Sequence, residues 1–150
     1  MATSAVTPDN DAVVAEVFIA APPERVFQAI TDPKQMPLWW GQQGLYRVTD
    51  WKAELRPGGK WQSDGVGADG TSFRVEGEYL EVDPPRLLVH TWIASYSGAM
   101  KTVVRWELSA TKAGSRVKVT HSGLAVQPIA RKDYVGGWPG LLELLRKYCE

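Results

Sequence analysis

The sequence predicts an α+β domain in which one antiparallel sheet packs against a long C-terminal helix. A chain of 150 residues has the length of a single domain with one core. From residue 46 onward, short runs of alternating apolar and polar residues are separated by turn residues, a pattern typical of antiparallel strands joined by hairpins. Leucines at helical spacing follow near the C-terminus, as in an amphipathic helix.

The N-terminal part predicts one strand and two short helices. The segment 12–20 (AVVAEVFIA) alternates and is rich in β-branched residues, which favours a strand with one buried face. Pro22 and Pro23 end this strand and are tolerated in the first turn of a helix. That helix is expected to end at Asp32, and a second, shorter helical piece is expected at 34–38.

The remainder predicts a meander of strands and the terminal helix. Six further strands are expected at 46–56, 60–66, 72–82, 87–95, 101–110 and 115–121. Together with the first strand they make a sheet of seven. The C-terminal helix is expected to begin near Pro128, with Leu141, Leu142 and Leu145 on its buried stripe.

Composition limits the classes of partner and cofactor. The 17 basic and 17 acidic residues balance, and no basic cluster indicates nucleic acid binding. No apolar stretch is long enough to span a membrane. The lone Cys149 leaves no disulfide and favours a reducing compartment, so we expect the cytoplasm. The two histidines and one cysteine lack the spacing of a metal site, and no phosphate loop follows a strand. We therefore expect neither metal nor cofactor.

The polar segment 1–11 is expected to be a flexible leader, with the domain occupying 12–150. Six motifs within that domain carry a family resemblance. They are AAPPERVF at 20–27, TDPKQMPLWWG at 31–41, ELRPGGKW at 54–61, GEYLEVDPPRLLVHTW at 77–92, SRVKVTHSGL at 115–124 and GGWPGLLELL at 136–145.

In this order the motifs resemble the START-like, or SRPBCC, superfamily, and within it the AHSA family, named after an activator of a heat-shock chaperone ATPase. The resemblance implies a helix-grip fold, in which a curved sheet and the C-terminal helix enclose a ligand cavity. It also implies a link to stress response. This chain has Glu54 where the family usually has Asp. It lacks the N-terminal domain of the eukaryotic co-chaperones, which argues against a chaperone partner.

Seven tryptophans are the most unusual feature of the composition. Such rings fill cores as readily as they line pockets, and alternation along the strands indicates which side chains face inward. The ligand-binding residues that we expect are Trp40, Trp61, Ser63, Val104, Trp106, His121, Trp138 and Leu142. Of these, Trp40 and Trp138 are expected at the mouth of the cavity. The inward face of 87–95 stays undecided, because both of its faces are apolar.

No catalytic residue is assigned. His121 has the pKa range of an acid or base, but a histidine that makes one hydrogen bond at the edge of the core is the favoured interpretation. Glu54 and Arg56 share a strand face and are expected to form an ion pair. Glu76 and Glu78 also share a face, for which solvation is favoured over acid and base roles.

The leading hypothesis is a binding domain for a hydrophobic or aromatic small molecule. The first alternative is an enzyme of the cyclase, dehydratase or hydrolase type, which would place an ionisable group of perturbed pKa, His121 or Glu54, in the cavity. The second alternative is an interaction protein similar to the chaperone activators. Whether the chain is a monomer or a homodimer is left open.

Overall fold

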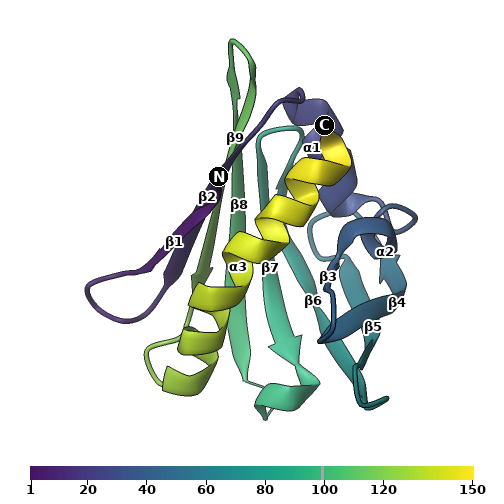
Figure 1. The fold of residues 1–150 in the computed structure, drawn as a ribbon, viewed down its shortest axis with the longest axis vertical. Helices are drawn as coiled ribbons and strands as arrows, with labels where there is room; N and C mark the ends of the chain where they lie inside the picture. The colour runs from purple at the N-terminus through teal and green to yellow at the C-terminus, as the bar shows by residue number, and fades with distance from the viewer. Residues whose placement is uncertain (99) are drawn as a thin grey trace.

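The computed structural model describes residues 1–98 and 100–150. One antiparallel sheet of nine strands, in the order β1-β2-β9-β8-β7-β6-β5-β4-β3, carries the long helix α3 across one face (Figure 1). The strands are β1 (Thr3–Val6), β2 (Val13–Ile19), β3 (Gly41–Gln42), β4 (Tyr46–Ala53), β5 (Lys60–Gly67), β6 (Ser72–Asp83), β7 (Leu87–Ala94), β8 (Lys101–Thr111) and β9 (Gly114–Ser122). The helices are α1 (Pro23–Thr31), α2 (Met36–Trp39), the 3-10 helix η1 (Ser95–Ser97) and α3 (Pro128–Cys149).

The α+β class, the single antiparallel sheet and the long C-terminal helix are confirmed, but the prediction of seven strands is wrong. The two further strands are β1 and β3, at opposite edges of the sheet. Strand β1 lies inside the expected leader and pairs with β2, with Thr3 opposite Glu16 and Val6 opposite Val13. Strand β3 has only two residues. Neither is long enough to show a period of its own, so each depends on the neighbouring strand.

The helices also differ from the prediction in their limits. Helix α2 begins at Met36 instead of residue 34. The carboxylate of Asp32 accepts the backbone N–H of Lys34 at 2.9 Å, and its carbonyl accepts that of Gln35 at 3.0 Å, so a turn occupies the expected first helical residues. Helix α1 keeps its expected proline start, because a proline in the first turn removes no helical hydrogen bond.

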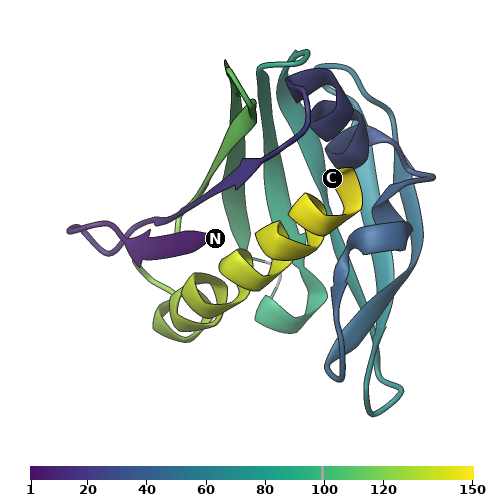
Figure 2. The same ribbon diagram turned by 45° about the horizontal axis from the view of Figure 1, so that its top comes forward.

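The buried faces of β2 and α1 follow the sequence pattern. Alternate residues of β2 from Val13 to Ile19 are buried, and Val26, Phe27 and Ile30 of α1 pack into the same core. Helix α3 begins at Pro128 as predicted and buries Leu142 and Leu145 completely. Seen from above, the sheet bends around α3, with α1 and α2 beside it (Figure 2). The space between helix and sheet is therefore the core.

The structure shows which face of β7 points to the core, a question that the sequence left undecided. Its core side carries Leu88 and Trp92, and His90 contacts the rings of Trp61 and Tyr79. Thr91 instead lies on the opposite side, where its hydroxyl accepts the backbone N–H of Glu78 at 2.8 Å. Residues on both faces of β7 are buried, so the sequence of this strand shows no alternation.

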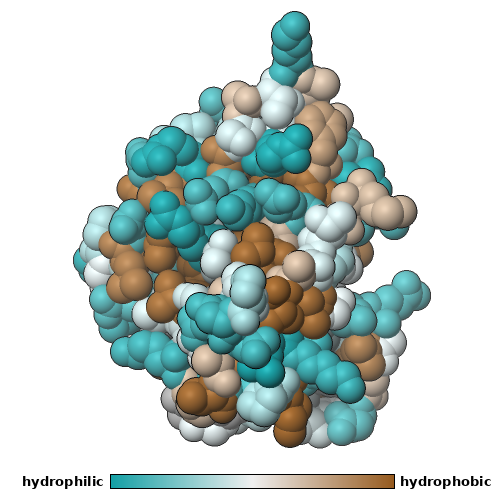
Figure 3. Space-filling model, turned by 90° about the vertical axis from the view of Figure 1, so that its left-hand side faces the viewer, coloured by the Kyte–Doolittle hydropathy of each residue, from teal (hydrophilic) through white to brown (hydrophobic). Residues whose placement is uncertain are grey.

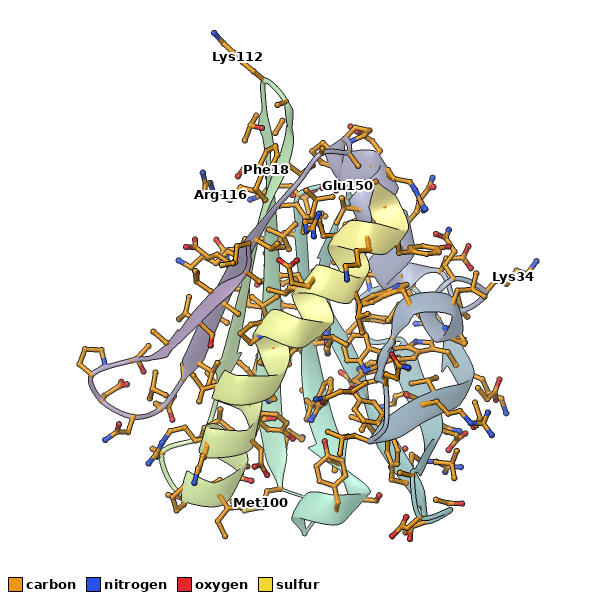
Figure 4. All side chains as sticks on the ribbon, in the orientation of Figure 1. Phe18, Lys34, Met100, Lys112, Arg116 and Glu150 are labelled. Atoms are coloured by element: carbon orange, nitrogen blue, oxygen red, sulfur yellow. The ribbon has the colours of Figure 1, made fainter. Side chains whose placement is uncertain are left out.

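The outside of the molecule is mixed in polarity. On the face seen in Figure 3, apolar side chains are interrupted by polar ones. Charged side chains such as Lys34 and Lys112 project into solvent in Figure 4, while other side chains crowd the space between α3 and the sheet. In the described ranges, no helix combines the length and the apolar character that crossing a membrane requires.

Candidate functional site

A cavity of about 660 Å³ lies between α3 and the strands β4 to β7. Its lining comes from Trp40, which directly follows α2, from the turn between β3 and β4, from the sheet and from one face of α3. Nine of its 23 lining residues are aromatic, and five of the seven tryptophans contribute to it. They are Trp40, Trp51, Trp61, Trp92 and Trp138.

The tryptophans form a continuous wall. Trp51 and Trp61 are stacked, with centroids 5.4 Å apart and planes at 16°, while Trp40 lies 5.4 Å from Trp51 and 6.1 Å from Trp138. Trp61 reaches further and donates its indole N–H to the carbonyl of Thr91 at 3.2 Å. It does so across β6 at Gly77, where a Cβ would lie 2.6 Å from the indole nitrogen. Contacts between neighbouring rings therefore join the tryptophans into one wall.

Three glycines keep the helical side of the cavity open. Gly136, Gly137 and Gly140 of α3 all line it, and a Cβ built on each would meet no other atom within 4 Å. Each glycine inside a helix costs about 1 kcal/mol relative to alanine. Side chains at these positions would extend into space that the protein leaves unfilled.

Four of the eight residues expected to bind ligand line this cavity, namely Trp40, Trp61, Ser63 and Trp138. The expected position of Trp138 at the mouth of the cavity is wrong. It lies in the middle of α3 and is only 3% exposed. The rim instead carries Leu45 and Tyr96, which are 58% and 60% exposed.

The other four expected residues do not lie on the wall. Val104, Trp106, His121 and Leu142 are between 0% and 2% exposed and pack in the interior beside the cavity. Alternation correctly predicted that Val104, Trp106 and His121 point inward from the sheet, and helical spacing did so for Leu142. Neither pattern could distinguish a wall residue from one buried beneath the wall, because both point to the same side of their strand or helix.

His121 is held in a directed chain of hydrogen bonds. The indole N–H of Trp138 lies 3.3 Å from Nδ1 of His121, and since an indole can only donate, Nδ1 accepts. Nε2 therefore carries the proton and donates to the hydroxyl of Thr102 at 2.7 Å, which donates to the carbonyl of Trp92 at 3.2 Å. Burial lowers the pKa of His121 from 6.5 to about 3. Its basic nitrogen is already occupied.

His90 is bound in the same way by a second tryptophan. The indole N–H of Trp106 donates to Nε2 of His90 at 3.1 Å, and Nδ1 donates to the carbonyl of Thr91 at 3.0 Å. Burial lowers the pKa of His90 from 6.5 to about 4. A proton added to either histidine would face an indole N–H, so both imidazoles are neutral near pH 7.

The charged candidates remain outside the cavity. Glu54 and Arg56 form the expected ion pair at 3.1 Å, in which both side chains are more than half exposed. Glu78 pairs with Lys60 at 2.7 Å on the outer face. In the described ranges, no three His, Cys, Asp or Glu side chains gather closely enough to hold a metal ion.

Sequence reasoning missed several residues of the wall. Trp51, Trp92 and Tyr134 line the cavity, and Trp92 donates its indole N–H to the hydroxyl of Tyr134 at 3.1 Å. The glycines of α3 were also missed. Their clustering in a segment of helical pattern was a usable signal, because glycine lowers helix stability and persists there when space is required.

Comparison with known proteins supports this architecture. Residues 20–150 match the family model described as Activator of Hsp90 ATPase homolog 1-like protein. The chain belongs to this family. The resemblance drawn from the six motifs is thereby confirmed, and the matched segment includes every cavity residue named above. No curated protein matches the chain.

Solved structures share the fold of this chain. A Rhodobacter sphaeroides protein superposes with a TM-score of 0.85 at 19% identity, covering 98% of this chain and 96% of its own. A Nitrosomonas europaea protein gives 0.82 at 19% identity, covering 95% of both chains. DynU16, a protein of the dynemicin biosynthetic locus, gives 0.75 at 22% identity over 92% of this chain and 46% of its own. At these identities the likeness concerns the fold alone.

Proposed function

We propose that this protein is a binding domain that holds a hydrophobic, aromatic small molecule between its sheet and α3. The observation that carries the proposal is the cavity of about 660 Å³ walled by five tryptophans. Small-molecule sites typically measure about 300–1,000 Å³ and combine apolar, aromatic walls with a few polar groups. Indole faces offer a planar ligand large contact areas and favourable stacking.

The glycines of α3 support the same proposal. Gly136, Gly137 and Gly140 are exposed positions of α3, where alanine would stabilise the helix. The glycines instead leave room beside Trp138. The lone Cys149 is half-buried and unpaired, which suits the reducing cytoplasm that we propose as the site of binding.

Neither catalysis nor chaperone activation is part of the proposal. The basic nitrogen of each histidine accepts a hydrogen bond from a tryptophan N–H, so no catalytic residue is assigned. The family description names an ATPase activator homologue, and that activity is not carried over to this chain.

The test uses the neutral fluorescent probe N-phenyl-1-naphthylamine. We expect saturable binding of one probe per chain, with quenching of tryptophan emission. Gly137→Phe places a ring in the open space beside α3 and should weaken binding by roughly tenfold or more, since it removes the volume that the probe occupies. Helix stability should not suffer, because phenylalanine is a better helix former than glycine.

The matched control is Lys132→Phe, which adds the same ring to the same helix at an exposed position outside the cavity. It should bind the probe like the wild type. Binding that never saturates, or equal binding by Gly137→Phe and the wild type, would show that the cavity does not take up such molecules.

A further inference from the structure

Two buried polar groups meet on the strand side of the cavity. Trp51 of β4 and Ser63 of β5 are directly opposite each other in the sheet, and both line the cavity. They are only 8% and 3% exposed. Since paired residues of antiparallel strands point to the same face, the indole and the hydroxyl belong to one patch of the wall.

Neither group has a partner among the residues that the structure describes. The Nε1 atom of Trp51 is the buried side-chain polar atom left without a hydrogen bond there. Ser63 Oγ makes no hydrogen bond to any described residue and faces the cavity that it lines. Three other tryptophans of the wall differ from Trp51 in this respect. Trp61, Trp92 and Trp138 each donate the indole N–H to an acceptor.

Buried polar groups are nearly always paired, because an unmade bond in the interior costs stability. A buried indole N–H without a partner, next to a hydroxyl that lines the same wall, therefore indicates that a ligand supplies the missing acceptor. An indole N–H can only donate, and a hydroxyl donates readily. The group that satisfies both is an oxygen acceptor with two lone pairs, such as a carbonyl.

The charge of the residues that line the cavity limits the class of ligand further. No Lys, Arg or His is among the described residues that line the cavity, and the one carboxylate there, Asp133, is exposed at its rim. An anionic ligand would bury its charge without a cation, which is strongly unfavourable. A neutral oxygen fits the site better than a carboxylate.

We infer that the ligand is a neutral aromatic carbonyl compound whose carbonyl oxygen accepts a hydrogen bond from Ser63 Oγ. This inference rests on the proposed function and names its ligand class. The indole N–H of Trp51 is the second donor to the same oxygen. This nitrogen is buried, so the indole must turn for its N–H to reach the oxygen, whereas Ser63 lines the cavity and is the direct anchor. The aromatic part of the ligand lies against Trp61, which is stacked on Trp51.

The experiment compares two probes of the same shape by calorimetry at pH 7.5. They are 2-acetylnaphthalene, which carries a carbonyl, and 2-isopropenylnaphthalene, in which a CH₂ group replaces the oxygen. Ser63→Ala should weaken binding of the ketone about threefold to tenfold, the range of one neutral hydrogen bond. Binding of the hydrocarbon should change less than twofold. Ser63→Thr keeps a hydroxyl and should retain the preference for the ketone.

Two further arms probe the second donor and the charge. Trp51→Phe removes the N–H and keeps a ring, so it should selectively weaken binding of the ketone. The anion 2-naphthoate should bind the wild type at least tenfold more weakly than the ketone, because the described lining of the cavity offers no cationic side chain to pair with its carboxylate. Naphthoate binding as tight as that of the ketone would overturn the neutral ligand class.

The outcomes separate this inference from the proposed function. If N-phenyl-1-naphthylamine binds but the ketone does not, or if Ser63→Ala affects both naphthalene probes equally, the carbonyl anchor is wrong and the aromatic binding site stands. If neither N-phenyl-1-naphthylamine nor any of the naphthalenes binds the wild type, both proposals fail.

Discussion

The hydroxyl of Ser4 donates a 2.5 Å hydrogen bond to the backbone carbonyl of Val135. In a regular helix this carbonyl would accept the N–H of the fourth following residue, but that residue is Pro139, inside α3, which has no N–H. Strand β1 therefore supplies the donor that the helix lacks. The contact joins the N-terminal strand β1 to the C-terminal helix α3, next to the glycines that line the cavity.

Replacing Ser4 by alanine should lower the free energy of unfolding by about 1 kcal/mol, because it leaves the carbonyl of Val135 without a donor. Thr3→Ala, at an exposed position of the same strand, should cost less. In a Pro139→Ala background the restored N–H serves the carbonyl, so Ser4→Ala should lose most of its effect. A double-mutant cycle from urea unfolding measures this coupling, and additive effects would contradict it.

Stability should fall as the pH drops from 7.5 to 5. Burial lowers the pKa of His121 to about 3 and that of His90 to about 4, against 6.5 without burial. The unfolded chain therefore takes up protons below pH 6.5 while the folded chain does not. Each histidine should cost about 2 kcal/mol by pH 5, at roughly 1.4 kcal/mol per pH unit. The measurement is urea unfolding at several pH values.

The control for this pH dependence replaces both histidines by glutamine. A glutamine keeps an acceptor for the indole N–H and a donor, but it does not titrate in this range. Its stability curve should be nearly flat between pH 5 and 7.5, since carboxylates stay ionised there. An equally steep curve in the variant would assign the pH dependence to other groups.

Gly77→Ala should be strongly destabilising. The new Cβ would lie 2.1 Å from the carbonyl oxygen of Thr91 and 2.6 Å from the indole nitrogen of Trp61, so the strands or the ring must move. Overpacking and the lost Trp61 bond together should cost about 3 kcal/mol. Gly137→Ala meets nothing within 4 Å and should stabilise α3 by up to about 1 kcal/mol. Equal effects in thermal unfolding would be incompatible with this geometry.

The leucines of α3 should differ in their sensitivity to truncation. Leu142 and Leu145 are 0% exposed and lie outside the cavity wall, so replacement of either by alanine should cost about 2–5 kcal/mol. Leu141 lines the cavity and should cost less, because its truncation enlarges an existing space instead of creating a void. Urea unfolding of the three variants tests this order, and an equal loss at Leu141 would indicate that the cavity closes around it.

Strands and helices were predicted correctly where the periodic pattern of apolar residues was long enough to be recognised. Alternation identified β2 and the meander from β4 to β9, and the leucine stripe identified α3. The strands β1 and β3 were missed because their order comes from pairing with β2 and β4. Strand β7 gave no decision on its inward face, since burial on both sides removes the alternation.

The candidate site was half predictable for the same reason. Alternation predicted that Trp61, Ser63, Trp106 and His121 all face inward. It did not separate the first two, which line the cavity, from the last two, which are buried beside it. Which inward side chains stay uncovered depends on how far α3 stands from the sheet. A local pattern does not contain that distance.

By itself the sequence determined the fold class, the family, most of the strands and the inward faces, because these follow from local periodicity and from motifs. Only the tertiary structure decided which tryptophans form the cavity wall, which indoles donate to His90 and His121, and that Trp51 Nε1 has no hydrogen-bond partner among the described residues. These features arise from contacts between residues far apart in the chain. A hydrogen bond such as that between Trp138 and His121 exists only once helix and sheet have packed.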